Sequence, residues 1–272
     1  MSRERRPVDV VVLSDIHLGT AACRAEDLLD YLRSIEPQRL ILLGDIIDLW
    51  GFERSAWSET HTKVLRRLLK FAQRGIPVHY VIGNHDEALT AYAPFSLGTI
   101  TLCRQLELEL AGVRTWFIHG DVVDGLVDTP RWMAWLGTRS YDTLVTINTL
   151  TNRVRAGLGW PKASFAAMVK QRVGQANAHV RRYEELCARL AGERGFGAVV
   201  CGHIHVPAIR RITTDGHSVD YHKSGDWTDT GSALEFHDGS WKSIRHGELA
   251  ALGLLPVHEH EPADEEEMAL AV

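Results

Sequence analysis

The stretch VDVVVLSDIH, residues 8–17, decides the fold class, because the apolar run of a buried strand ends abruptly in a carboxylate and an imidazole. The same pattern recurs in four later runs: RLILLGD at 39–45, PVHYVIGN at 77–84, VRTWFIHG at 113–120 and GAVVCGH at 197–203. Strands that are apolar on both sides suit a sheet covered on both faces. The sequence therefore predicts an α/β fold in which polar groups follow the strands.

Helical patterns separate the first three strands. Apolar residues recur at intervals of three to four over residues 25–35 and 59–73, which predicts a β-α-β-α-β order. A longer helical section follows Gly125, and short strands with Gly or Asp turns return over residues 208–246. We therefore expect an inserted helical segment at about residues 126–195 within one catalytic domain.

The composition narrows the class of protein. With 272 residues, 45% of them hydrophobic, the chain can bury a full core. The sequence has no run of about 18 apolar residues, and the start MSRERRPV is followed by no apolar run, so we expect a cytoplasmic protein without a signal peptide. The four cysteines form no CxxC pair, which argues against a disulfide framework and a thiolate zinc site.

Charge is unevenly distributed around a net value of −5. Residues 130–183 hold nine basic residues and one acidic residue. The end of the chain, HEHEPADEEEMALAV from His258, is acidic and of low complexity. Such a composition does not bury enough apolar area to order itself. We therefore expect a catalytic domain over residues 1–247 and an acidic, disordered tail over 248–272.

Metal-capable side chains follow each of the five predicted strands. They are Asp15, His17, Asp45, Asn84, His119, His203 and His205. Taken singly, each has an ordinary explanation as a turn cap or a hydrogen-bonded core residue. Because the carboxyl ends of strands in an α/β sheet meet at one crevice, their joint occurrence predicts a metal centre. In D-x-H and H-x-H, both side chains leave an extended segment on the same side.

The donor set indicates the kind of metal and substrate. Nitrogen and oxygen donors without cysteine favour Mn²⁺, Fe²⁺, Zn²⁺ or Co²⁺. Seven ligands hold two ions most simply if one carboxylate is shared, and Asp45, midway in the series, is the expected bridge. Two divalent ions, two carboxylates and a hydroxide leave a net charge of about +1, which suits an anionic phosphoryl group. The sequence therefore predicts metal-assisted phosphoester hydrolysis without a protein nucleophile.

Five blocks carry a resemblance to a known family. SDIHLG, GDIID, GNHDE, HGD and GHIH are similar, in this order, to the motifs of the calcineurin-like metallophosphoesterase superfamily. The resemblance implies a four-layer α-β-β-α sandwich with two mixed sheets.

The same resemblance implies a role for each site residue. Asp15, His17 and His205 would hold one metal ion, and Asn84, His119 and His203 would hold the other, with Asp45 as the bridge. Asp48 would orient the ligands without binding metal, and Asp86 would orient His85. His85 would stand over the metals unligated, steadying the phosphoryl charge or protonating the leaving oxygen.

A narrower resemblance covers Val8 to Gly247. The segments SDIHLGT, LLGDIIDLW, CGHIHVPAI and SGDWTDTGSALEF are similar to those of the UDP-2,3-diacylglucosamine pyrophosphatase group. Members of that group cleave the pyrophosphate of a nucleotide-linked glycolipid, usually with Mn²⁺. If this chain acts on such a lipid, we expect it to contact the inner membrane face peripherally, through the basic insertion. One departure is His85, because members of the group commonly have Arg at that position.

The narrower resemblance implies that the helical insertion is a lid over the substrate. The candidate substrate contacts in it are Arg131, Trp132, Trp135, Arg139, Lys162 and Lys170. Apolar rings suit acyl chains and the cations suit phosphates. The ordinary alternative is a basic amphipathic cap that packs on the core.

Two further functions stay open at the level of sequence. A phosphodiesterase or nuclease of the same superfamily would use the basic segment to follow a nucleic-acid backbone. Polar substitutions at Trp132 and Leu136 should abolish the activity of a lipid enzyme and spare that of a nuclease. A non-catalytic binding scaffold would require eroded ligands, and the intact set of seven argues against it.

Overall fold

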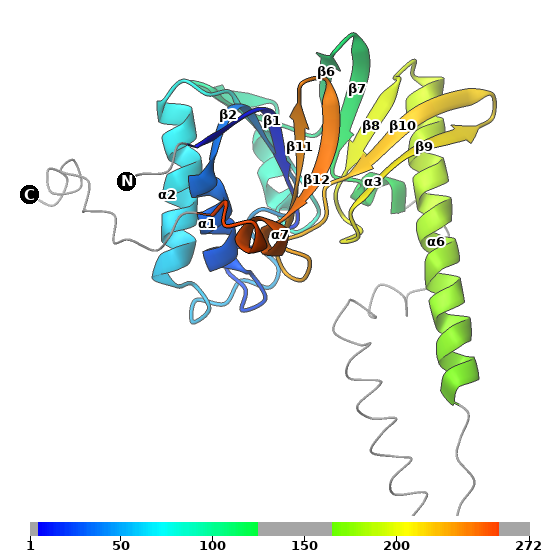
Figure 1. Cartoon of the computed structure of the whole chain (residues 1–272), viewed down its shortest axis with the longest axis horizontal. Coiled ribbons are helices and arrows are strands. Elements are labelled where there is room, and N and C mark those ends of the chain that lie inside the picture. The colour runs from blue at the N-terminus through cyan, green and yellow to red at the C-terminus, as the bar shows by residue number, and fades with distance from the viewer. Residues whose placement is uncertain (1–4, 125–164, 256–272) are drawn as a thin grey trace, which may run out of the picture.

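The computed structural model describes residues 5–124 and 165–255, without the side chains of residues 124 and 165–177 (Figure 1). The strands are β1 (Arg6–Leu13), β2 (Ile35–Leu43), β3 (Val78–Val81), β4 (Phe95–Leu97), β5 (Ile100–Cys103), β6 (Leu106–Leu110), β7 (Val113–Ile118), β8 (Ala198–Cys201), β9 (Ala208–Thr214), β10 (His217–Lys223), β11 (Ser232–His237) and β12 (Ser240–Arg245). The helices are α1 (Ala25–Ser34), α2 (Glu59–Gln73), the 3₁₀ helix η1 (Glu87–Tyr92), α3 (Asp121–Asp124), α6 (Phe165–Glu193) and α7 (His246–Ala251).

The described strands form two mixed sheets. The first has the order β12-β11-β1-β2-β3-β5-β4, and the second has the order β6-β7-β8-β10-β9. In the first sheet, β1, β2, β3 and β5 run parallel, whereas β11, β12 and β4 pair antiparallel. In the second sheet, β7, β8 and β10 are parallel, with antiparallel β6 and β9 at the edges. Mixed sheets of this kind agree with the prediction.

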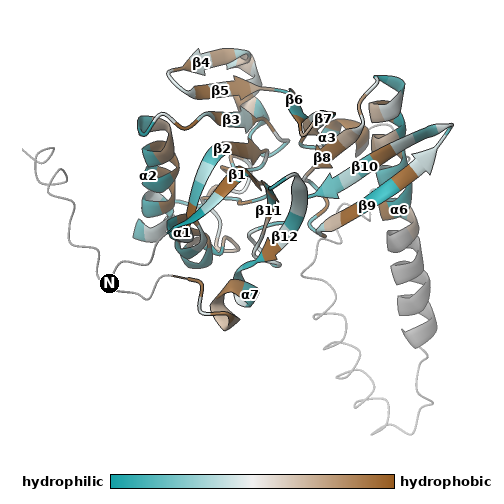
Figure 2. Cartoon of the chain, turned by 45° about the horizontal axis from the view of Figure 1, so that its top comes forward, coloured by the Kyte–Doolittle hydropathy of each residue, from teal (hydrophilic) through white to brown (hydrophobic). Residues whose placement is uncertain are grey.

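The arrangement of the sheets and helices in layers can be seen from β1, whose alternate residues point to opposite faces of the first sheet. Val11 belongs to a buried cluster with Leu28 of α1 and Phe71 of α2. Val10, one residue away, belongs to a second cluster with Phe117 of the other sheet. The two sheets therefore pack face to face, with α1 and α2 outside the first sheet and α6 outside the second (Figure 1). Figure 2 shows hydrophilic and hydrophobic residues along α2, as expected of a helix with one buried face.

Helix α6 covers the outer face of the second sheet. Its residues Tyr183, Cys187 and Ala191 are buried in a cluster with Trp116 and Tyr221. The C-terminal part of the segment 126–195, predicted as an inserted lid, is therefore a core helix of the sandwich. Of the candidate substrate contacts, Arg131, Trp132, Trp135, Arg139 and Lys162 lie outside the described residues, as does the side chain of Lys170 on α6.

Two element boundaries differ from the sequence prediction. Strand β2 begins at Ile35, directly after α1, because Ile35 pairs with Arg6 of β1, and the apolar run alone indicated a start at residue 39. The predicted start of the tail at residue 248 falls inside α7, where Leu249 is buried in the cluster formed with α1 and α2. Residues 256–272 of that tail lie outside the described residues.

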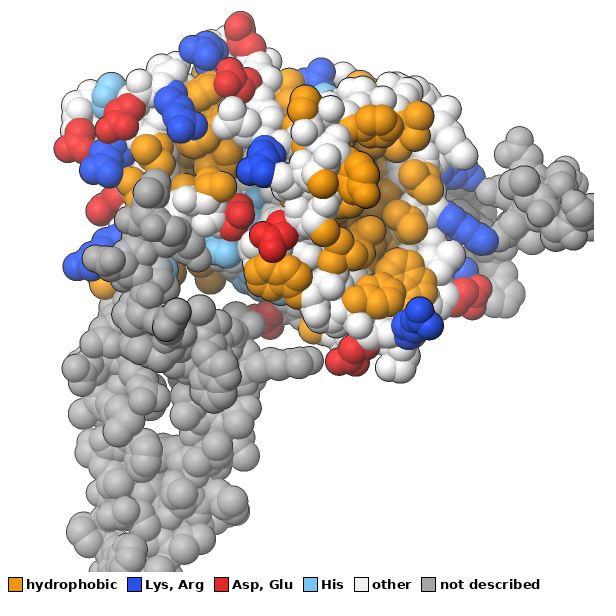
Figure 3. Space-filling view, turned by 180° about the vertical axis from the view of Figure 1, so that it is seen from behind, with side chains coloured by type: hydrophobic (Ala, Val, Ile, Leu, Met, Phe, Trp, Pro, Cys, Tyr) orange, Lys and Arg blue, Asp and Glu red, His pale blue; other side chains and the backbone are white. Residues whose placement is uncertain are grey.

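The described surface is mixed in charge. Figure 3 shows acidic and basic side chains interspersed over one face, next to a group of hydrophobic side chains.

No described helix combines the length and hydropathy needed to span a bilayer.

Candidate metal centre

All seven predicted ligands follow the carboxyl ends of strands, and the two sheets bring them to one place. Asp15, His17, Asp45 and Asn84 come from the first sheet, following β1, β2 and β3. His119, His203 and His205 come from the second sheet, following β7 and β8. Backbone hydrogen bonds tie neighbouring loops together: Asp15 N–H donates to Gly44 O at 3.1 Å, and Gly202 N–H donates to His119 O at 2.9 Å.

The first cluster contains Asp15, His17 and His205. One ligand atom of each lies within 4.8 Å of the others. The Nε2 atom of His205 is 3.3 Å from Oδ1 of Asp15. These three residues are the ones that the family resemblance groups around one ion.

The second cluster contains Asp45, His119 and His203, again with ligand atoms within 4.8 Å of one another. Nε2 of His119 lies 3.3 Å from Oδ2 of Asp45 and 3.2 Å from Oδ1 of Asn84. The same Asp45 oxygen is 3.9 Å from Nε2 of His17. Asp45 therefore lies between the two clusters, where a bridging carboxylate has to be.

The outer nitrogens of two of these rings are held by acceptors. Nδ1 of His119 donates to the carbonyl oxygen of Leu43 at 2.9 Å, and Nδ1 of His17 lies 2.9 Å from Oδ2 of Asp48. A carbonyl or carboxylate acceptor places the ring proton on Nδ1 and leaves the Nε2 lone pair facing the cluster. This is the arrangement that a metal-ligating histidine requires.

Two buried atoms of the first cluster fit a bound cation. Oδ1 of Asp15 and Nε2 of His17 are shielded from solvent and have no hydrogen-bond partner. Buried polar atoms in proteins are normally paired with a donor, an acceptor, water or an ion. Because one is an anionic oxygen and the other an imidazole nitrogen, a divalent cation satisfies both, and the donor set fits the metal that the motifs imply.

The electrostatics of the two clusters favour positive charge. Burial alone would lower the pKa of His119, but the Asp45 carboxylate raises it to about 10. Burial likewise opposes protonation of His205, and Asp15 raises the pKa of that ring to about 9. The carboxylates therefore hold protons on these rings when no other cation is present. Binding of a divalent ion releases those protons, because a ligating imidazole must be neutral.

The backbone is strained at the candidate ligands. Asp15, His17, Asp45 and His203 have φ values of 51°, 53°, 55° and 66°, in the left-handed region that residues other than glycine rarely adopt. Each such conformation costs on the order of 1–3 kcal/mol and persists where the surrounding structure enforces it. These residues are among those whose ligand atoms lie within 4.8 Å of one another in each of the two clusters, so the strained backbone coincides with the candidate metal centre.

Two glycines allow the loops to approach one another. A Cβ atom on Gly44 would lie 2.3 Å from Nδ1 of His119, and a Cβ atom on Gly83 would lie 2.4 Å from Oδ1 of Asp45. Neither position has room for a side chain. The glycines next to the ligands therefore bring His119 and Asp45 close enough to share a site.

His85 lies beside the first cluster. Its ring centroid is 4.7 Å from that of His17, and its side chain is 28% exposed. Asp86 was predicted to orient His85, but no hydrogen bond or ion pair joins the two among the contacts of the described residues. The buried Asp86 carboxylate accepts hydrogen bonds from Gly83 N and Ile46 N instead, at 2.6 and 2.9 Å. Asp48 takes the expected place, with Oδ2 2.9 Å from Nδ1 of His85.

Sequence reasoning missed Trp50. Its ring is 62% exposed, yet it lies with its centroid 4.9 Å from that of His85. Its backbone N–H donates to Oδ1 of Asp48 at 3.1 Å, so Trp50 is tied to the carboxylate that faces His85. The only signal in the sequence was a large aromatic residue two positions after Asp48. A tryptophan near an apolar strand is equally consistent with a buried core residue.

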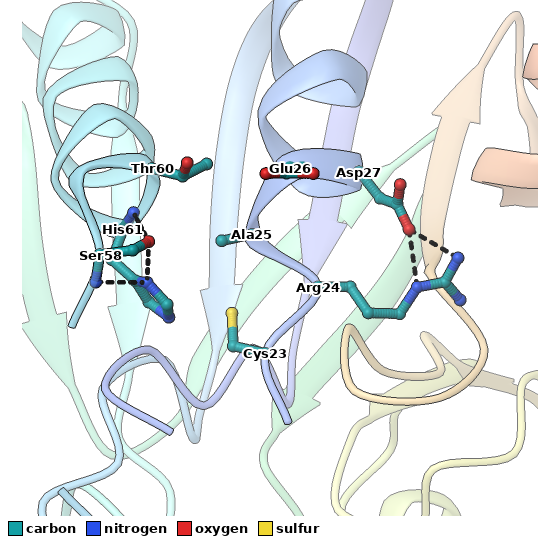
Figure 4. Close-up of a pocket in the computed structure, with 8 residues that line it drawn as sticks. All are labelled: Cys23, Arg24, Ala25, Glu26, Asp27, Ser58, Thr60 and His61. Carbon is teal, nitrogen blue, oxygen red and sulfur yellow. Dashed lines mark hydrogen bonds and ion pairs between the residues drawn. The ribbon is translucent and has the colours of Figure 1, made fainter. Parts of the chain in front are cut away.

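A separate pocket of about 240 Å³ lies between the N-termini of α1 and α2 (Figure 4). Its residues are Cys23, Arg24, Ala25, Glu26, Asp27, Ser58, Thr60 and His61. The Arg24 guanidinium is paired with Asp27, Nε to Oδ2 at 2.7 Å. None of the seven candidate ligands lines this pocket, so it is distinct from the metal centre.

The chain is similar to several known proteins. The family model described as calcineurin-like phosphoesterase matches residues 8–207. The UDP-2,3-diacylglucosamine hydrolase of Nitrosococcus oceani is 26% identical over 246 residues, covering 82% of this chain and 88% of the relative. The protein of the same name from Aeromonas salmonicida is 23% identical and covers 93% and 98%. The solved structure of Yfce, a phosphoesterase from E. coli, is 18% identical, covers 88% and 93%, and gives a TM-score of 0.45.

The family match includes every strand end that carries a candidate ligand, from Asp15 to His205. It also covers well over half of the 272 residues. The chain therefore belongs to the calcineurin-like phosphoesterases, a family of metal-dependent enzymes.

Proposed function

We propose that this protein is a dinuclear-metal hydrolase that cleaves the pyrophosphate bond of a nucleotide-linked glycolipid of the UDP-2,3-diacylglucosamine type. The main observation that supports hydrolase activity is the position of Asp45 between two clusters of ligand atoms. The choice of substrate rests on the relatives named UDP-2,3-diacylglucosamine hydrolase, which align over most of this chain.

In this proposal the two clusters hold two ions. Asp15, His17 and His205 hold the first, Asn84, His119 and His203 hold the second, and Asp45 bridges them. When bound, a pair of divalent ions lowers the pKa of a shared water and stabilises the charge of an in-line displacement at phosphorus. Mn²⁺ is the proposed ion by resemblance, and Fe²⁺, Zn²⁺ and Co²⁺ suit the same donors.

His85 is the proposed catalytic side chain. With Nδ1 held by Asp48, its Nε2 is the nitrogen left to meet the substrate. From there it donates a hydrogen bond to a phosphoryl oxygen or a proton to the leaving phosphate oxygen. A protein nucleophile is not needed, because water supplies the attacking oxygen.

The rest of the substrate is assigned to the insertion. Arg131, Arg139, Lys162 and Lys170 are the proposed phosphate contacts, and Trp132 and Trp135 are the proposed acyl contacts. The excess of basic residues in this segment also suits contact with anionic lipid headgroups at the inner membrane face. These roles stay proposals, because the segment lies largely outside the described residues.

The deciding experiment compares three substrates. The Mn²⁺-loaded protein is incubated with UDP-2,3-diacylglucosamine, bis-p-nitrophenyl phosphate and single-stranded nucleic acid, with D45N as the control for metal dependence. We expect release of UMP from the glycolipid nucleotide in the wild type and none in D45N. Turnover of only the other two substrates would replace the proposed substrate by that of a general phosphodiesterase or nuclease.

A further inference from the structure

The segment SGDWTDT, residues 224–230, belongs to none of the five blocks that carry the predicted ligands, yet it contacts the first cluster. The hydroxyl of Ser224 lies 2.6 Å from that of Ser14, which in turn donates to the Asp15 carboxylate. The backbone N–H of Trp227 donates to the carbonyl oxygen of Asp15 at 3.0 Å. The segment therefore supports Asp15 from behind.

Asp226, in the middle of this segment, is fully buried. Its Oδ2 accepts hydrogen bonds from the backbone N–H groups of Thr228 and Asp229, at 3.0 and 2.6 Å, and from the Thr228 hydroxyl at 2.5 Å. Its Oδ1 accepts from the backbone N–H and the hydroxyl of Thr230, at 3.0 and 2.6 Å. Five donors from one tight turn fix the carboxylate in position and stabilise its negative charge.

The fixed carboxylate faces a predicted metal ligand. Oδ2 of Asp226 lies 3.6 Å from Nδ1 of His205, while Nε2 of the same ring lies 3.3 Å from Oδ1 of Asp15. Asp226 faces Nδ1 of His205 as Asp48 faces Nδ1 of His17, but at a longer distance, 3.6 Å against 2.9 Å. The ring of His205 is the more exposed of the two, so it has more need of an external partner to hold its orientation.

We propose that Asp226 is the positioning residue of the first metal site: its fixed negative charge faces Nδ1 of His205, favours the proton on that nitrogen and so leaves Nε2 free to bind the ion. The inference rests on the proposed function only in requiring that the first cluster binds a metal. It gives the SGDWTDT segment a role in building the site from the β10–β11 connection, away from the five ligand blocks.

The test measures metal binding rather than activity. Metal-free wild type, D226N and T228A are titrated with MnCl₂ in a calorimeter. T228A removes one donor to Asp226 but leaves the charge that faces His205, so it controls for disturbance of the turn. We expect D226N to weaken one of the two binding events by about 10- to 100-fold and T228A to leave both close to wild type. Two unchanged events in D226N, or equal losses in both variants, would overturn the proposal.

A double-mutant cycle isolates the path through His205. We expect H205A and H205A/D226N to bind Mn²⁺ with the same affinity, because Asp226 has no ligand left to position. Additive losses would show that Asp226 acts on the fold and not on His205. Failure of the glycolipid assay leaves this outcome intact, because Mn²⁺ alone is the probe.

A measurement on the wild type covers the case in which D226N does not fold. In the Zn²⁺-loaded protein with ¹⁵N-labelled histidine, long-range ¹H–¹⁵N correlations report which ring nitrogen of His205 carries the proton. We expect the proton on Nδ1. A proton on Nε2 would contradict the proposed role of Asp226.

Discussion

The Nδ1 atom of His85 lies 2.9 Å from Oδ2 of Asp48. The same oxygen lies 2.9 Å from Nδ1 of His17, and the other carboxylate oxygen accepts from Gly51 N–H at 2.6 Å. Burial alone would raise the pKa of Asp48, but the Gly51 N–H and the two histidines hold it below its usual value. One ionised carboxylate therefore positions both a proposed metal ligand and the proposed catalytic side chain.

Replacement of His85 by alanine should separate catalysis from metal binding. In the proposed mechanism His85 meets the phosphoryl oxygens and is not a metal ligand, so H85A removes a catalytic group and leaves the seven ligands in place. We expect turnover to fall by about 10²- to 10⁴-fold, with two metal ions still bound per chain by elemental analysis. Loss of an ion from H85A would show that His85 is itself a ligand.

Replacement of Asp48 by asparagine should affect both functions, because the amide carries no negative charge to face the rings of His17 and His85. We expect D48N to lower turnover and to weaken Mn²⁺ binding at one site by about 10- to 100-fold, measured by steady-state kinetics and calorimetry. In H85A the catalytic side chain is already absent. Adding D48N to H85A should therefore lower turnover further only as much as the weaker Mn²⁺ binding lowers metal occupancy. Wild-type metal affinity in D48N would contradict the contact between Asp48 and His17.

Alanine at Gly44 should damage the metal centre beyond its effect on the backbone. Gly44 and Gly75 have nearly equal φ values, +81° and +82°, so either alanine variant incurs about 1–2 kcal/mol of backbone strain. Only at Gly44 would the new Cβ meet His119, whereas Gly75 has open space around it. We expect G44A to lose metal and activity and G75A to lose only stability in urea unfolding. Equal Mn²⁺ affinity in the two variants would contradict the close approach.

His222 should make the protein acid-sensitive. Burial lowers its pKa to about 4, and its ring packs with the centroid 5.1 Å from that of Trp241. Because the unfolded chain binds the proton near pH 6.5, the His222 contribution to stability is complete above that pH. It is lost as the pH falls toward 4, by about 1.4 kcal/mol per pH unit.

Urea unfolding of metal-free wild type and H222Q at pH 7 and pH 5 checks this expectation. The other titrating groups are common to both proteins and cancel in the comparison. We expect the loss of unfolding free energy between the two pH values to be smaller in H222Q. An identical loss in both proteins would show that His222 is protonated in the fold.

The seven candidate ligands were readable from the sequence for a simple reason. Each follows an apolar run that is long enough to be a strand, and parallel strands in a sheet place their carboxyl ends at one edge. The helices α1 and α2 were readable because their apolar residues repeat at helical spacing. The donor types, the charge balance of the site and the five motif blocks together predicted the class of chemistry.

Other features depended on contacts between residues far apart in the chain. The start of β2 at Ile35 depends on pairing with β1. The helix α7 forms where a disordered tail was predicted, because Leu249 is buried against α1 and α2. Neither contact produces a periodic pattern of apolar residues in the local sequence. The start of β2 and the start of the tail were therefore predicted several residues away from their positions in the structure.

The sequence by itself determined which residue types stand at the strand ends, and these nitrogen and oxygen donors predict a metal centre that acts on phosphoesters. The tertiary structure alone decided which carboxylate serves which imidazole. His85 meets Asp48 and not its neighbour Asp86, because the Asp86 carboxylate is turned toward the backbone of Gly83 and Ile46. Asp226 reaches His205 across 21 positions of sequence, because the strands β8 and β10 are hydrogen-bonded neighbours. Both pairs, Asp48 with His85 and Asp226 with His205, depend on proximity in space, which the linear pattern of residues does not encode.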